Sequence, residues 1–178
     1  MPSIRRALPV DAAPLAAFAE RTFRATFGPF NTPSDMDLVC AASYGESLQA
    51  RELADPGLTT LLAESDGVLA AYVQLRHESD LADGLGDHAV ARTAEIVRLY
   101  VDTPWHGHGI AQQLMTDAIA LATHSGARRI ALGVWEHNPR AIAFYEKCGF
   151  VEVGAHQFML GTDAQRDVVM ARDLPANA

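Results

Sequence analysis

The sequence predicts an α+β domain with a mixed sheet of about seven strands and about four helices. A long helical pattern at 110–124 lies between strand-like runs at 94–101 and 129–135, which suits the crossover of a parallel βαβ unit. Shorter strand-like runs joined by turns precede and follow this unit, so hairpins extend the sheet. A chain of 178 residues can bury one sizeable core. We expect one domain over residues 1–174 and a tail at 175–178.

Turn residues and apolar spacing predict the other elements. Apolar side chains recur every three or four positions after Asp11, which predicts an amphipathic helix with Asp11 as its N-cap, closed by Gly28 and Pro29. The pair Asp66-Gly67 predicts a hairpin turn between β-rich runs at 58–63 and 68–75. The remaining expectations are an edge strand at 3–8, a helix starting at 32–35, a third helix bounded by Ser47 or by 55–57, a loop at 77–92, and a closing hairpin of 150–153 with 167–171.

Composition and charge narrow the classes of function. Hydrophobic residues make up 49% and charged residues 20%, as in ordinary soluble proteins; no apolar run approaches the roughly 18 residues of a membrane span, and no signal-peptide pattern opens the chain. The net charge of −8 argues against nucleic acid as a partner and suits a cationic small substrate, although many proteins are acidic for solubility alone. Cys40 and Cys148 give no disulfide framework, so we expect a reducing cytoplasm.

The turn Trp105-His106-Gly107-His108-Gly109-Ile110-Ala111 has the pattern of an anion site. It follows one strand-like run and opens directly into the helical pattern. The free N–H groups of a first helical turn attract anions, and glycines let the backbone approach a phosphate, although an isolated G-x-G is more often only a tight turn. Gln112 stands where a dinucleotide fingerprint needs Gly or Ala, and the chain has no Gly-Lys-Ser/Thr triplet, so neither common phosphate motif applies.

Further motifs give this turn a family context. The pattern His106-x-x-Gly109-x-Ala111 resembles the Q/R-x-x-G-x-G/A signature of the GCN5-related N-acetyltransferases, with His106 in the place of Gln or Arg. Asn138 followed by A-x-x-F-Y-x-K-x-G-F at 141–150 resembles the closing βα unit of that family. The segments 132–136, 154–156 and 167–171 are similar to those of the PaiA-type polyamine (spermidine/spermine) acetyltransferases.

The resemblance implies a fold, a coenzyme and a set of contacts. It implies that the two central parallel strands splay and that the arm of acetyl-CoA lies between them almost as an extra strand. The residues that it assigns to the pyrophosphate are His106, Gly107, His108, Gly109, Ile110 and Ala111. The residues that it assigns to the pantetheine arm are Leu99, Tyr100, Val101 and Asn138, although an Asn before Pro is also an ordinary helix N-cap. Lys147 and Arg140 either reach the coenzyme phosphates or are simply exposed.

Tyr145 is the expected general acid of an acetyl transfer. The family motif places its tyrosine here, beside the departing sulfur. A phenol can stabilise a thiolate by a hydrogen bond and return its proton. The alternative is an aromatic residue packed on the sheet, because Ala141, Tyr145 and Cys148 share one helix face.

Glu95 is the expected base. An acceptor amine arrives mostly protonated at neutral pH, and Glu95 is the carboxylate best placed to take that proton, directly or through a water. Period two places Glu95, Val97, Leu99 and Val101 on one sheet face. The alternative role of Glu95 is an ion pair with Arg98 or Arg92.

The expected function is transfer of an acetyl group from acetyl-CoA to a primary amine, which the resemblance narrows to a polyamine or another small amine. Acidic residues of the region before residue 55 either meet a cationic substrate or form solvated helix faces; these are Asp35, Asp37, Glu46 and Glu52. The alternatives are a peptide N-acetyltransferase, which needs an open groove, and a non-catalytic acetyl-CoA-binding regulatory domain. A homodimer is typical of related enzymes. No metal site is expected, because His106-x-His108 lacks a third ligand and His77, Asp87 and His88 have no ligand spacing.

Overall fold

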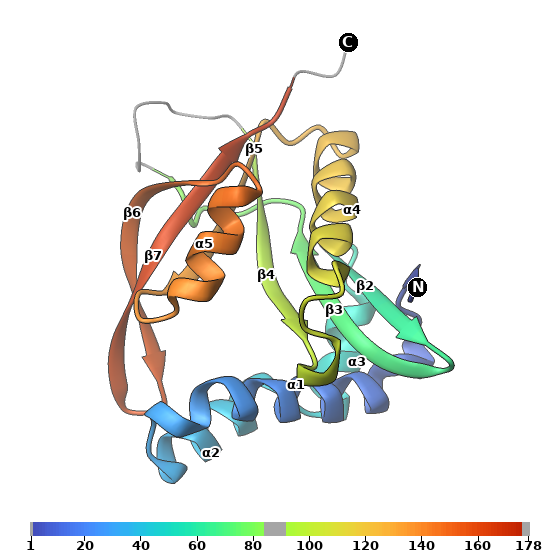
Figure 1. The fold of residues 1–178 in the computed structure, drawn as a ribbon, viewed down its shortest axis with the longest axis vertical. Coiled ribbons are helices and arrows are strands. Elements are labelled where there is room, and N and C mark those ends of the chain that lie inside the picture. Colours follow the sequence, from blue (N-terminus) through green and yellow to red (C-terminus); the bar gives the residue numbers. More distant parts are fainter. Residues whose placement is uncertain (1, 84–91, 176–178) are drawn as a thin grey trace.

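The computed structural model describes residues 2–83 and 92–175 and shows one mixed seven-stranded sheet with helices on both faces (Figure 1). The strands have the order β1-β2-β3-β4-β5-β7-β6 and are β1 (Ser3–Arg6), β2 (Leu58–Ser65), β3 (Val68–Arg76), β4 (Thr93–Val101), β5 (Arg129–Trp135), β6 (Val151–Leu160) and β7 (Asp163–Asp173). The helices are α1 (Ala12–Phe27), α2 (Pro33–Ser43), α3 (Glu46–Ala54), α4 (Ile110–His124) and α5 (Pro139–Lys147). The strand pairs are antiparallel apart from β4 and β5, which are parallel and joined through α4.

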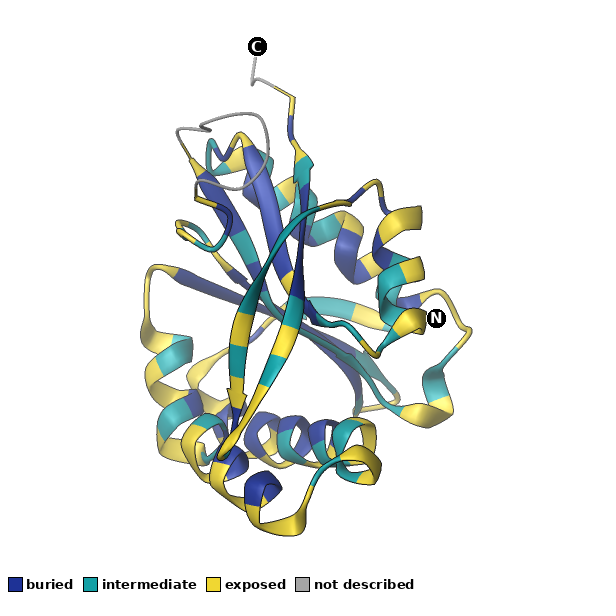
Figure 2. Cartoon of the chain, turned by 90° about the vertical axis from the view of Figure 1, so that its left-hand side faces the viewer, coloured by how far each residue is buried: buried dark blue, intermediate teal, exposed yellow. Residues whose placement is uncertain are grey.

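The two faces of the sheet carry separate apolar cores. On the first face, α4 and α5 cover β3, β4 and β5. On the second face, α1 and α2 pack on β2 and β3. Side chains alternate along β5, so Ile130, Leu132 and Val134 enter the first core while Ala131 faces the other way. Burial is highest in the middle of the sheet, whereas β6 and the adjoining end of β7 are mostly half-buried or exposed (Figure 2).

Strands β4 and β5 separate soon after they meet. They pair at three positions, where Thr93, Ala94 and Glu95 lie opposite Arg129, Ile130 and Ala131. Beyond Glu95 the strands diverge, and the sheet opens into a V between its two halves (Figure 1). The expected splay between the central parallel strands is therefore confirmed.

A β-bulge in β4 changes which side chains share a face. The register between β3 and β4 shifts after Gln74, so that Gln74 lies opposite Arg98 and Leu75 opposite Ile96. Ile96 and Leu99 consequently face the same core, although an odd spacing separates them. The expectation that Glu95 shares a face with Leu99 and Val101 is wrong, because the extra residue of a bulge breaks the period of two. Glu95 lies between two residues of the first core, so its side chain points to the second face.

The segment between α1 and α2 closes the wide end of the V. The rings of Phe27 and Phe30 lie 6.0 and 5.4 Å from that of Trp135 at the end of β5. In α2, the Asp35 carboxylate accepts hydrogen bonds of 2.7 and 2.8 Å from the backbone N–H and the hydroxyl of Thr162, in the turn between β6 and β7. The N-terminal helices therefore connect the two halves of the sheet at the end where their strands diverge (Figure 1).

Most predicted elements are confirmed. The βαβ unit and the Asp66-Gly67 turn are present, and both turn residues have positive φ, as the hairpin requires. The first strand ends at Arg6, and the α-helices number five in the described residues. Strands β6 and β7 extend well beyond the predicted segments, because their outer parts lack the apolar alternation that reveals a strand. Asp87, His88 and the tail beyond residue 175 lie outside the described residues.

Asp11 occupies the N-cap position of α1 but does not cap the helix. Its carboxylate binds the Arg5 guanidinium at 2.7 and 2.8 Å and accepts the N–H of Leu8 at 2.7 Å. These contacts hold the pKa of Asp11 below its usual value, chiefly through the bond from Arg5. Asp11 thus fastens the helix start to strand β1.

Candidate functional site

The glycine turn between β4 and α4 presents an open, uncapped helix N-terminus. Gly107 and Gly109 have φ of +80° and +78°, and a Cβ placed on either would meet no atom within 4 Å. Gly109 is the N-cap of α4 and supplies no side chain to the first N–H groups, and the first turn carries no acidic residue. A helix start leaves the N–H groups of Ile110, Ala111 and Gln112 without intrahelical partners. The turn therefore fits an anionic group such as a pyrophosphate.

His106 links the turn to the end of β4. Its Nε2 lies 2.9 Å from the carbonyl oxygen of Val101, and because a carbonyl only accepts, this nitrogen carries the proton. The Arg140 guanidinium lies against the same ring, with one terminal nitrogen 3.2 Å from Nδ1, which can accept from it, and the other 3.3 Å from Nε2. His108 bonds the carbonyl of His106 at 3.0 Å and lies against the Trp105 ring. The imidazole of His106 is thus structural and brings a permanent cation, Arg140, to the anion site.

The end of β4 and the start of α5 meet beside this turn. Leu99, Tyr100 and Val101 are half-buried and lie beyond the last pair with β5, so their backbone borders the V. Asn138 caps α5, where its side-chain oxygen accepts the N–H of Ala141 at 3.2 Å. The alternative role of Asn138, as a helix N-cap, is confirmed, and its contact with the pantetheine arm stays a prediction.

Lys147 lies away from this group. It is exposed in the last turn of α5, about 10 Å along the helix axis from Arg140, given a rise of about 1.5 Å per residue. Of the two basic residues expected near the coenzyme phosphates, the structure brings Arg140 to the glycine turn.

Tyr145 is buried on α5 and faces the V. Its ring lies against those of Phe144 and Phe150, and it belongs to the first core together with Cys148. Burial raises the pKa of Tyr145 well above its usual value, with a smaller contribution from Cys148. Burial also raises the pKa of Tyr100 on β4, and the nearby phenols of Tyr44 and Tyr145 add to that shift. The Tyr145 phenol is therefore close to β4, packed on the sheet and fully protonated at neutral pH.

Glu95 lies on the second face at the point where the V begins. Its side chain is 14% exposed, and its Oε2 accepts from Arg76 at 2.8 Å and from Ser79 at 2.6 Å. The expected partners were wrong, because Arg98 binds Glu52 at 2.6 Å and Arg92 binds Glu78 at 2.9 Å. The strand pairing explains this difference, since Arg76 on β3 lies opposite Glu95, whereas Arg98 lies opposite Gln74.

The acidic residues of the N-terminal helices mostly have internal roles. Asp35 binds Thr162, Asp37 pairs with Arg24 at 2.9 Å, and Glu52 pairs with Arg98 at 2.6 Å, while Glu46 is exposed. Hydrogen bonds from Thr32 and Thr162 hold the pKa of Asp35 below its usual value. The expectation that this set is either substrate-facing or solvated is therefore wrong for Asp35 and Glu52.

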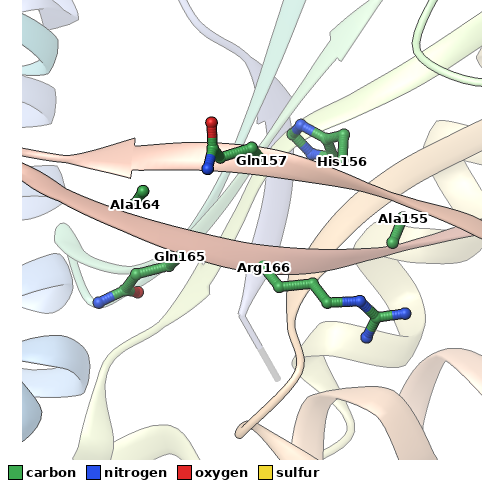
Figure 3. Close-up of a pocket in the computed structure, with 6 residues that line it drawn as sticks. All are labelled: Ala155, His156, Gln157, Ala164, Gln165 and Arg166. Atoms are coloured by element: carbon green, nitrogen blue, oxygen red, sulfur yellow. The ribbon is translucent and has the colours of Figure 1, made fainter.

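The second face contains a group of side chains to which the sequence patterns assigned no individual role. Trp135, Asp167 and His156 lie side by side on β5, β7 and β6. Between them and Glu95, Gly133 is exposed on the sheet, and a Cβ there would lie 2.8 Å from Nε2 of His156. The β6–β7 hairpin also carries a hollow, lined by Ala155, His156, Gln157, Ala164, Gln165 and Arg166 (Figure 3). Trp135, His156 and Asp167 lie in the three segments that resemble the PaiA-type acetyltransferases, but only the pairing of β5, β7 and β6 brings them side by side.

Neither a metal cluster nor a membrane span occurs in the described residues. They contain no group of three or more His, Cys, Asp or Glu side chains arranged to hold a metal ion. No helix within residues 2–83 and 92–175 has the length and apolar character to cross a membrane.

Comparison with known proteins agrees with this geometry. The model of the acetyltransferase (GNAT) family matches residues 20–150. An uncharacterized N-acetyltransferase of Mycobacterium tuberculosis is 35% identical over 164 residues, which cover 92% of this chain and 98% of the relative.

Solved structures share the fold. The PaiA N-acetyltransferase of Thermoplasma acidophilum in complex with coenzyme A has a TM-score of 0.78 at 20% identity, covering 98% of this chain and 99% of that one. The spermidine/spermine N-acetyltransferase SpeG of Vibrio cholerae, solved in mutant forms, has a TM-score of 0.64 at 20% identity, covering 97% of this chain and 95% of that one. With the family match, the chain belongs to the acetyltransferase (GNAT) family and is an N-acetyltransferase that takes its acetyl group from acetyl-CoA.

Proposed function

We propose that this enzyme acetylates a primary amine of a small, cationic acceptor, with a polyamine such as spermidine or spermine as the favoured class. The observation that carries this proposal is the closure of the V by Phe27 and Phe30 against Trp135. A peptide acceptor needs an open groove through which its chain can continue, and these rings stand across that path. Spermidine and spermine are the named acceptors of SpeG, which shares the fold.

The residues that would hold acetyl-CoA form a continuous track. The pyrophosphate would lie on the backbone of His106, Gly107, His108, Gly109, Ile110 and Ala111, with Arg140 beside it. The pantetheine arm would lie along the backbone of residues 99–101, which has no β5 partner. Asn138 supports this track as the cap of α5, and Lys147 would interact with coenzyme phosphates only by reaching back along the helix. Bound acetyl-CoA supplies a thioester, whose carbonyl carbon the amine attacks.

Tyr145 would act as the general acid and Glu95 as the base. The amine attacks directly in a ternary complex: the C–N bond forms, the C–S bond breaks, and Tyr145 donates its hydrogen to the departing thiolate. The nitrogen of the new amide releases its extra proton, which returns Tyr145 to its protonated form. Glu95 would accept the proton of the arriving ammonium group through a chain of waters, because it lies about 13 Å along β4 from Leu99, at roughly 3.3 Å per residue. Both of its described hydrogen bonds fall on Oε2, which supports a role for Oε1.

The experiment that tests this function measures thiol release from acetyl-CoA with a panel of acceptors. The panel contains spermidine, spermine, putrescine, lysine and short peptides with free N-termini. We expect saturable turnover with the polyamines and little with the peptides. Turnover with peptides alone would overturn the small-amine proposal, and coenzyme binding without turnover of any amine would favour a regulatory acetyl-CoA-binding domain.

Two further properties are proposed with this function. A homodimer is expected through a sheet edge, since β1 and β6 are both edge strands, and light scattering at several concentrations measures the oligomeric state.

A cytoplasmic location is expected because Cys40 and Cys148 are free, buried thiols.

A further inference from the structure

The floor of the second face beyond Glu95 is built from small residues. Ala131 and Gly133 on β5 and Gly154 on β6 lie on or beside this face, and the register places Gly133 and Gly154 opposite the same residue, Val169. Pairing of β4 with β5 ends at Ala131, so Gly133 lies on the margin of the V, on the side opposite α5 and Tyr145. An acceptor that approaches the thioester from this side passes over Gly133.

Asp167 lies at the end of this row of small residues, and its carboxylate has few partners in the described residues. Its side chain is 15% exposed, and within the described residues its carboxylate receives no hydrogen bond. Its ion-pair partner is His156, whose Nε2 lies 3.9 Å from Oδ2, beyond hydrogen-bond distance. The neighbouring Arg166 is directed to Glu136 at 3.0 Å. A carboxylate that is largely withdrawn from water and receives no donor from the protein favours a cation.

The surroundings of Asp167 suit an alkylammonium group. Trp135 lies beside Asp167 in the strand register, and its ring contacts those of Phe27, Phe30 and His137. Aromatic faces attract cations and accept the methylene groups between them. Burial raises the pKa of Asp167, while His156 lowers it and Glu136 raises it further. A bound ammonium group would lower this pKa, as His156 does.

Resting on the proposed function, we infer that Asp167 binds an ammonium group of the acceptor beside the Trp135 ring and so determines specificity for cationic amines. His156 is a positioning residue, because its imidazole lies over Gly133 and next to Asp167. A Cβ at position 133 would lie 2.8 Å from Nε2, so a residue larger than glycine would displace that ring. Glu95 and Asp167 then mark opposite ends of one acceptor path.

The test compares Asp167→Asn with Glu152→Gln, each of which removes one negative charge from the β6–β7 hairpin. Glu152 is the matched control because its side chain is 59% exposed and its nearest cation lies 3.9 Å away. For Asp167→Asn we expect a KM for spermidine at least about tenfold higher, with kcat and the KM for acetyl-CoA within about twofold of the parent enzyme. Glu152→Gln should leave all three constants within about twofold.

Three further measurements complete the test. Calorimetric titration of the coenzyme-A-bound enzyme with spermidine should show weaker binding by the same factor for Asp167→Asn, and the carboxylate variant Asp167→Glu should recover part of it. Gly133→Ala, which displaces His156, should also raise the KM for spermidine. An unchanged spermidine KM in folded Asp167→Asn would overturn this inference while leaving the acetyltransferase intact. Failure of the parent enzyme to acetylate any amine would instead overturn the proposed function.

Discussion

Tyr145 keeps its proton because burial disfavours the phenolate, and this determines how the residue can act. A phenol with a raised pKa is fully protonated across the neutral range, so it can donate a hydrogen bond to a departing thiolate at any physiological pH. The same desolvation disfavours a free thiolate in that position, which increases the benefit of a neighbouring donor.

The substitution Tyr145→Phe removes only the hydroxyl group. We expect kcat to fall roughly ten- to a thousand-fold with little change in the KM for acetyl-CoA, because the donor acts mainly in the transition state. Tyr44→Phe is the matched control, since Tyr44 is also a buried phenol with a pKa raised by burial but lies among α1, α2 and β4. Equal kcat values for the parent and Tyr145→Phe would remove Tyr145 from the mechanism.

The pH profile provides a second check on Tyr145. Since the folded-state pKa is raised, the phenol stays protonated as the pH rises past about 10, the usual value for tyrosine. The kcat of the parent enzyme should therefore show no loss between about pH 8 and 10 that is absent in Tyr145→Phe. A loss near pH 10 confined to the parent enzyme would mean that the phenol is solvated.

At the scale of elements, the glycine turn and the segment between α1 and α2 define the two ends of the site. The turn was predictable because its determinants are local: a strand, two glycines and a helical pattern in sequence. The closure of the V was not, because Trp135 is more than a hundred residues from Phe27 and Phe30 in the sequence and meets them only after the sheet forms. The partner of Glu95 was missed for a related reason, since Arg76 lies on the neighbouring strand and meets Glu95 only through the pairing of β3 with β4.

Gly109→Val tests the turn. A β-branched residue is strained at a φ of +78° and places atoms in the open space before α4, so we expect loss of coenzyme A binding by calorimetry. Gly67→Val is the control, because Gly67 has a φ of +74° and an equally open Cβ position but lies in the β2–β3 hairpin turn. Coenzyme binding in Gly109→Val as tight as in Gly67→Val would contradict the phosphate site.

Phe30→Ala tests the closure of the V. Phe30 is 67% exposed, and its ring contacts that of Trp135. Loss of the ring should therefore change stability little while widening the acceptor entrance. We expect a several-fold higher KM for spermidine and improved turnover of a short peptide. Leu38→Ala on α2 is the control, since Leu38 is also exposed, at 53%. Identical acceptor preferences in Phe30→Ala and the parent enzyme would show that the contact between Phe30 and Trp135 does not determine acceptor selectivity.

At the scale of the whole molecule, a few polar contacts hold the N-terminal helices to the C-terminal hairpin. Asp35 is the main one, with its bonds to Thr162 and a further bond of 2.6 Å from the Thr32 hydroxyl. The proposed single domain over residues 1–174 implies that this connection breaks in the same transition as the sheet. We therefore expect one urea-unfolding transition, and two separate transitions would contradict the single domain.

Acid should weaken this connection in a defined direction. The folded-state pKa of Asp35 lies below its unfolded value, so its contribution is complete above the unfolded pKa of about 4 and is lost as the pH falls through the folded value. Asp35→Ala should lower the urea midpoint near pH 7, and the difference from the parent should shrink below about pH 4. Asp37→Ala, on the exposed side of α2, is the control and should have little effect at either pH. A pH-independent effect of Asp35→Ala would exclude the carboxylate charge as its cause.

The short seam between β4 and β5 has a mechanical consequence. Three paired positions hold the two halves of the sheet together, so the halves can rotate about the β4–β5 pairing. The contacts of Phe27 and Phe30 with Trp135 restrain that rotation at the wide end of the V. A molecule that hydrogen-bonds the free edges of both β4 and β5 would fix the two halves of the sheet relative to each other. Slower backbone hydrogen exchange at residues 96–101 and 132–135 on adding coenzyme A would record the two halves becoming one rigid sheet.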